Sequence, residues 1–156
     1  REAVAFYASR AAEKLRRSRL AATVVVVFVS SGRFREEPCY SNSCLLGLNV
    51  ATDFTPELIA HALRGVGRVY SPGVRYKKAG VMLLGLVPAS PAQGGMFDRL
   101  DRERGRRLMS AVDGVNERMG AETLRFAATG TARGWKMLRG RRSPRYTTCW
   151  DELLEL

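Results

Sequence analysis

The stretch that decides the fold is Thr23-Val-Val-Val-Val-Phe-Val29, a run of β-branched residues that contains one aromatic ring. Such a run is too short and too uniformly apolar for a surface helix. It is typical of a strand that is covered on both faces or lies in the centre of a sheet. We therefore predict a sheet that is built around residues 23–29.

Helical and extended patterns alternate on both sides of this strand. Apolar side chains recur at helical spacing before it, and the pattern ends in arginines, which the helix dipole favours at that end. A second helix is expected to start at Thr55-Pro56, with Thr55 as its side-chain cap. The predicted elements are helices over residues 2–19 and from 55 to about 70, and strands over 23–29, 40–50 and 76–87.

The order helix, strand, strand, helix, strand indicates an α+β fold. It is a split βαββαβ sheet with two helices that lacks its opening strand. We expect the chain to begin just after that strand, which leaves a three-stranded sheet with one exposed edge. Such an edge is a candidate for pairing with another molecule.

The composition divides the chain into three parts. Residues 1–88 form the compact domain, and residues 89–97 are a linker rich in small residues. Residues 98–156 form a mainly helical and irregular extension. It contains an amphipathic pattern from Leu100 to Met119, a short strand over 123–128 and little periodicity beyond.

The net charge points to a polyanionic partner. Lys and Arg outnumber Asp and Glu by 26 to 15, which gives a formal net charge of +11. Seven basic residues and no acid lie between Thr123 and Trp150. A basic run without acids is a better phosphate surface than mixed charge would be, although the same charge can also serve solubility.

Cysteine usage and hydropathy indicate the cellular compartment in which the chain is located. The three cysteines form no CxxC pair, and His61 is the single histidine, so we expect free thiols in a reducing compartment and no zinc site. No apolar stretch approaches the roughly 20 residues that cross a bilayer. The expected location is the cytoplasm, without a membrane partner.

Four segments together resemble the C-terminal part of UmuC-like members of the Y family of translesion DNA polymerases. They are Ala11-Ala-Glu-Lys-Leu15-Arg-Arg17, Tyr40-Ser-Asn-Ser43, residues 72–84, and Arg142-Ser-Pro-Arg-Tyr-Thr-Thr148 with Trp150. The resemblance covers nearly the whole chain. It implies that residues 1–88 are the DNA-binding little finger and that the rest is a UmuC-type C-terminal extension.

The resemblance also implies that catalysis takes place elsewhere. Polymerases need paired carboxylates on a palm sheet to hold two metal ions, and no such set is found in this sequence. Asp98, Asp101 and Glu103 lie in a basic, helix-forming stretch, where pairing with neighbouring arginines is the simpler account. We expect no enzymatic activity and no cofactor in this fragment, and Mg²⁺ only in the palm of an intact DNA polymerase.

The residues expected to contact DNA surround two strand ends. They are Arg33, Tyr40, Ser41, Asn42, Ser43, Arg75, Tyr76, Lys77 and Lys78. Short side chains and exposed amides can approach phosphate oxygens, the cations supply charge, and the two tyrosines are expected to support the backbone. Any one of them could instead be a polar residue at the end of a strand that faces solvent and does not contact DNA. Arg33 could instead pair with Glu36 or Glu37.

The linker carries a motif that resembles the sliding-clamp-binding pentapeptide of bacterial polymerases, Gln93-Gly-Gly-Met-Phe97. Met96 and Phe97 would fill a hydrophobic pocket of the clamp, and the Gln93 amide would hydrogen-bond at its rim. The alternative is that Met96 and Phe97 pack against the start of the next helix.

The sequence suggests three classes of function. The first is a non-catalytic fragment of an error-prone polymerase of the SOS response and DNA repair, which grips primer-template without sequence preference and tethers it to the clamp. The second is an adaptor that binds a UmuD-like accessory subunit or a recombinase filament. An RNA-binding module is disfavoured, because Phe28 is the single mid-strand aromatic residue and base stacking needs more.

Overall fold

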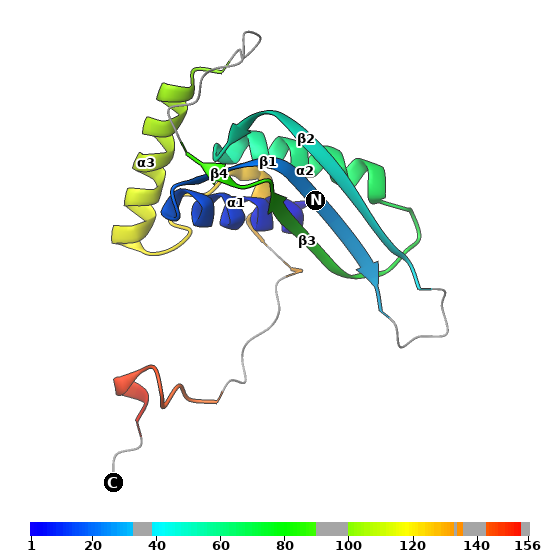
Figure 1. The fold of residues 1–156 in the computed structure, drawn as a ribbon. Helices are drawn as coiled ribbons and strands as arrows, with labels where there is room; N and C mark the ends of the chain where they lie inside the picture. The colour runs from blue at the N-terminus through cyan, green and yellow to red at the C-terminus, as the bar shows by residue number, and fades with distance from the viewer. Residues whose placement is uncertain (33–38, 90–99, 133, 136–142, 154–156) are drawn as a thin grey trace.

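The computed structural model describes residues 1–32, 39–89, 100–132, 134–135 and 143–153 (Figure 1). The elements in chain order are α1 (Glu2–Arg17), β1 (Leu20–Ser31), β2 (Ser41–Thr52), α2 (Thr55–Val69), β3 (Tyr76–Leu84), β4 (Val87–Pro88) and α3 (Arg102–Met119). Two short 3-10 turns follow at Ala127–Thr129 and Trp150–Glu152. The predicted α+β fold class is confirmed.

The valine-rich run forms the central strand of the sheet, as predicted. β1 pairs antiparallel with β2 on one side and with β3 on the other, and the two residues of β4 pair with its beginning. The register places Val26 opposite both Leu45 and Met82. Residues of β1 two positions apart point to the same face, so the register assigns each side chain of the sheet to one of two faces.

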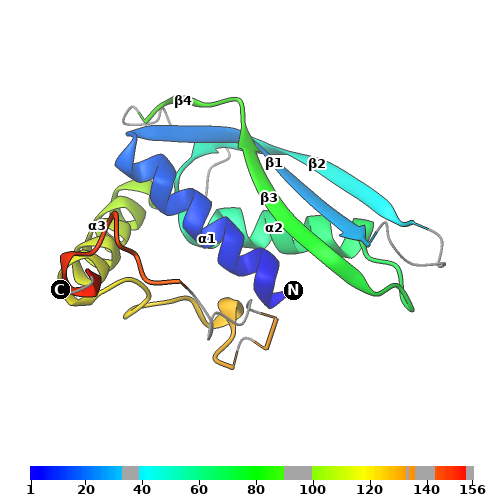
Figure 2. The ribbon, with the colours of Figure 1, turned by 90° about the horizontal axis from the view of Figure 1, so that it is seen from below.

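The first two helices, α1 and α2, cover the same face of the sheet (Figure 2). Val25, Val27 and Val29 point to this face and form the core together with side chains such as Ala8 and Leu58. The opposite face of the sheet, which carries Val24, Val26 and Phe28, has none of the described helices on it.

The third helix, α3, lies at the end of the sheet away from the β1–β2 hairpin (Figure 1). Met109 is its one buried residue. Two ion pairs attach α3 to the first two helices: Asp113 binds Arg16 of α1, and Arg102 binds Glu57 of α2. No described helix is both long enough and apolar enough to cross a bilayer.

Two local predictions were wrong. Residues 123–128 form no strand, because the side chain of Asn116 bonds both the N–H and the C=O of Leu124. Thr55 does not cap α2 but is its first residue, and its buried hydroxyl accepts a hydrogen bond from Arg16.

The last predicted strand, over residues 76–87, is interrupted. β3 ends at Leu84, and Gly85 follows with φ +60°, a left-handed conformation that favours glycine. The C=O of Gly85 accepts hydrogen bonds from both the backbone N–H and the hydroxyl of Thr23, after which β4 begins. The kink divides one predicted strand into two that both pair with β1.

Candidate nucleic-acid interface

The hairpin end of the sheet gathers most of the residues expected to contact DNA. The start of β2 brings Tyr40 to Ser43, and the start of β3 brings Arg75 to Lys78. The register sets Ser30 of β1 between Ser41 and Lys78. Ser41, Ser30 and Lys78, which come from three strands, therefore form one row across the sheet.

Tyr40 holds the hairpin and the end of α2 together. Its backbone closes the hairpin, because the Ser31 N–H donates to the Tyr40 C=O at 2.8 Å and the Tyr40 N–H donates to Ser31 Oγ at 2.8 Å. Its hydroxyl donates to the C=O of Val69 at 2.8 Å and accepts from Asn42 Nδ2 at 3.1 Å. Both ends of the residue are thus occupied by structural contacts.

Tyr76 organises the turn between α2 and β3. Its hydroxyl accepts from the N–H of Ser71 at 2.7 Å and donates to the C=O of the same residue at 3.1 Å. Its ring packs edge-on against Tyr40, with ring centres 5.9 Å apart, and also against Tyr70 at 5.7 Å. The two tyrosines expected at this site support the backbone that carries the polar residues.

The three residues at the start of β2 are exposed, with short polar side chains: Ser41, Asn42 and Ser43. The amide of Ser43 is less free than the sequence indicated, because its N–H donates to Asn42 Oδ1 at 2.8 Å. Rotation of the Asn42 side chain would release this N–H for another acceptor. Since β2 is an edge strand, a ligand can approach its backbone from the side.

The cations Arg75, Lys77 and Lys78 are all exposed. Within the described part of the chain, none of them takes part in an ion pair. The aliphatic stem of Lys77 lies over Gly32, where a Cβ would collide with it. The close approach keeps the lysine beside the hairpin without neutralising its charge.

Four of the residues predicted to bind partners lie outside the described residues. They are Arg33 of the presumed DNA surface and Gln93, Met96 and Phe97 of the clamp-binding motif. The described chain also places no group of three or more His, Cys, Asp or Glu side chains where they could hold a metal ion.

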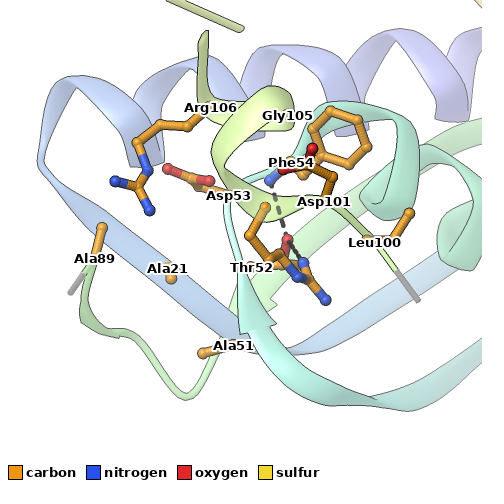
Figure 3. A pocket seen from close by; sticks show the side chains of 11 residues that line it. Ala21, Ala51, Thr52, Asp53, Phe54, Ala89, Leu100, Asp101, Gly105 and Arg106 are labelled. Carbon is orange, nitrogen blue, oxygen red and sulfur yellow. Dashed lines mark hydrogen bonds between the residues drawn. The ribbon is translucent and has the colours of Figure 1, made fainter. Parts of the chain in front are cut away.

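Sequence reasoning missed the junction between α3 and the sheet. A pocket of about 130 Å³ lies there, and Figure 3 shows its lining side chains, among them Thr52, Asp53 and Arg106. The Thr52 hydroxyl accepts from Arg102 Nη1 at 2.9 Å and from the Phe54 N–H at 3.1 Å. The arginine-rich composition of α3 is the signal that could have indicated such contacts, but it does not specify their partners.

Comparisons with known proteins identify the family of this chain. The domain family described as the impB/mucB/samB family C-terminal domain matches residues 1–96, and a domain of unknown function, DUF4113, matches residues 106–156. Three similar proteins come from Salmonella typhimurium. Protein ImpB is 41% identical over 154 residues, Protein SamB 40% over 155 and Protein UmuC 37% over 158.

These alignments cover 97% to 100% of this chain but 36% or 37% of the relatives. The chain therefore spans little more than a third of their length. Because the domain family matches more than half of the chain, the chain belongs to the impB/mucB/samB family and carries its C-terminal domain.

Proposed function

We propose that this chain is the DNA-gripping C-terminal part of an error-prone translesion DNA polymerase that acts in SOS mutagenesis and DNA repair in the bacterial cytoplasm. The observation that carries the proposal is the hairpin end of the sheet. There the exposed cations Arg75, Lys77 and Lys78 lie at the start of β3, and the exposed short polar side chains of residues 41–43 lie at the start of β2, with Ser30 of β1 between Lys78 and Ser41. Family membership supports the same reading.

This arrangement suits phosphate contact, which does not depend on the order of the bases. Serine hydroxyls, strand-edge amides and flexible lysines bind phosphate oxygens in any sequence. Such contacts fix the protein on the duplex and leave the template free to contain damage. In the whole protein, nucleotidyl transfer and its Mg²⁺ ions would belong to a catalytic part outside this chain.

Two further partners complete the proposal. The sequence Gln93-Gly-Gly-Met-Phe97 supports tethering to a sliding clamp. The C-terminal extension supports a second role as an adaptor for a UmuD-like accessory subunit or a recombinase filament. The two roles differ in their dependence on the cations of β3, since an adaptor has no need of them.

The test is a salt series of binding to a labelled primer-template and to an unrelated duplex of the same base composition. Both should bind equally, and the logarithm of the affinity should fall linearly with the logarithm of salt concentration, by about 0.9 for each phosphate contact. Replacing Arg75, Lys77 and Lys78 with alanine should weaken binding to both DNAs and lower this slope by about 2 to 3.

The matched control removes three exposed arginines from α3: Arg104, Arg107 and Arg118. This variant changes the net charge equally but should retain most of the slope. Equal losses in both variants would show that general charge, and not the hairpin end of the sheet, holds the DNA. Undetectable binding at low salt would reject the proposal and favour the adaptor.

A further inference from the structure

The uncovered face of the sheet has two halves of different chemistry. Near the hairpin, the rows across the three strands are Ser41–Ser30–Lys78 and Ser43–Phe28–Gly80. Farther along, they are Leu45–Val26–Met82 and Gly47–Val24–Leu84. One continuous surface therefore passes from polar and cationic to apolar within a few residues.

The apolar half is open to solvent on its two outer strands, whereas Val26 in its centre is buried. Leu45 is 62% exposed, Met82 49% and Leu84 44%. The ring of Phe28 lies over Gly80, where a Cβ would collide with it, so the ring extends the apolar surface toward the polar half. Contiguous apolar patches on soluble proteins usually mark a surface that meets another molecule.

Continuity and charge favour DNA as that molecule. The apolar rows adjoin Lys78 and the serines of the proposed phosphate-binding end, on a chain with a net charge of +11. The sheet is also too wide for the minor groove of DNA. Two strand spacings of about 4.8 Å put the backbones of β2 and β3 roughly 10 Å apart, whereas the minor groove is about 6 Å wide and the major groove about 12 Å.

The major groove offers one apolar group to a protein, the C5-methyl of thymine. We propose that the apolar half of this face, above all Leu45 and Met82, contacts thymine methyl groups while the hairpin end holds phosphates. This inference rests on the proposed function and deepens it. The affinity for DNA does not depend on the order of the bases, but it is higher for DNA whose pyrimidines carry a C5-methyl group.

Two pairs of duplexes test the inference. In the first, every thymine of an A·T-rich duplex is replaced by uracil, which removes the methyl groups and leaves every phosphate and hydrogen-bonding group in place. In the second, 5-methylcytosine replaces cytosine, which adds methyl groups to the same groove. Burying one methyl completely is worth about a fourfold change in affinity, so we expect a two- to fourfold loss with uracil and a similar gain with 5-methylcytosine.

The double variant Leu45→Ala, Met82→Ala should bind the members of each pair equally and keep the salt dependence. A control, Leu108→Ala with Met119→Ala, removes two side chains of α3 that are 50% and 72% exposed and should keep the discrimination. Circular dichroism checks that both variants fold.

Three other outcomes would reject the methyl contact, this face of the sheet or DNA binding itself. Salt-dependent binding with equal affinities within each pair would reject the methyl contact alone and leave this face to a partner protein. Discrimination that persists in the Leu45, Met82 variant would reject this face as its source. Failure to bind any DNA would reject the proposed function together with the inference.

Discussion

Replacing Arg16 with methionine should weaken the attachment of α3 to the rest of the fold. The guanidinium of Arg16 binds both carboxylate oxygens of Asp113, from Nε at 2.6 Å and from Nη2 at 2.8 Å. Its Nη1 donates to Thr55 Oγ1 at 2.7 Å and to the C=O of Asp53 at 2.9 Å. One side chain thus connects α1, the start of α2 and the middle of α3.

The expected cost lies between those of a buried and an exposed ion pair. Removing one partner of a fully buried pair costs about 3–5 kcal/mol, and an exposed pair contributes less than about 1 kcal/mol. The side chain of Arg16 is 13% exposed and that of Asp113 31%, and Thr55 is fully buried. We therefore expect a loss of about 2–3 kcal/mol, because the pair is partly screened and the buried hydroxyl loses its donor.

The assay is urea unfolding combined with hydrogen exchange of the α3 amides. In urea unfolding the loss is measured directly, and a thermal melt should show it as a fall in melting temperature of roughly 4–12 °C, at about 2–4 °C per kcal/mol. Hydrogen exchange of α3 should accelerate more than exchange of β1. The control is Arg17→Met, which removes a pair with Glu13 whose arginine is 70% exposed and should cost less than about 0.5 kcal/mol. A loss for Arg16→Met no larger than for Arg17→Met would refute the reasoning.

Two further substitutions test the sheet and the turn beside it. Gly80→Ala places a Cβ against the ring of Phe28 and should cost about 1–3 kcal/mol in urea unfolding, whereas Gly47→Ala adds a Cβ in open space and should be close to neutral; equal losses would contradict this packing. Tyr76→Phe removes both hydrogen bonds to Ser71 and should cost about 1–2 kcal/mol. Faster exchange of the Ser71 amide would confirm the loss, and unchanged exchange would show that the ring contacts alone hold the turn.

The order of the main elements could be predicted because each carries a local pattern. The valines of β1 and the apolar spacing of α1 and α2 depend only on near neighbours in the chain. The prediction for residues 123–128 failed because the amide of Asn116, on the preceding helix, holds Leu124 in another conformation. A contact of this kind has no signature in the segment that it controls.

The candidate interface was predictable to a similar extent. The sequence indicated which residues surround the ends of two strands, and the supporting role expected for Tyr40 and Tyr76 is visible in their hydrogen bonds. It did not indicate that the Asn42 side chain occupies the amide of Ser43. Side-chain rotamers depend on the surrounding packing, so such a contact cannot be read from residue types.

By itself, the sequence determined the central strand, the two helices that cover it and the basic character of the hairpin end. Only the tertiary structure decided which side chains share a face. Leu45 and Met82 lie in one row because both pair with Val26, and Arg16 meets Asp113 across 97 positions. Local patterns reflect backbone preferences and burial, whereas register and helix docking are set by contacts between distant segments, which no short stretch of sequence contains.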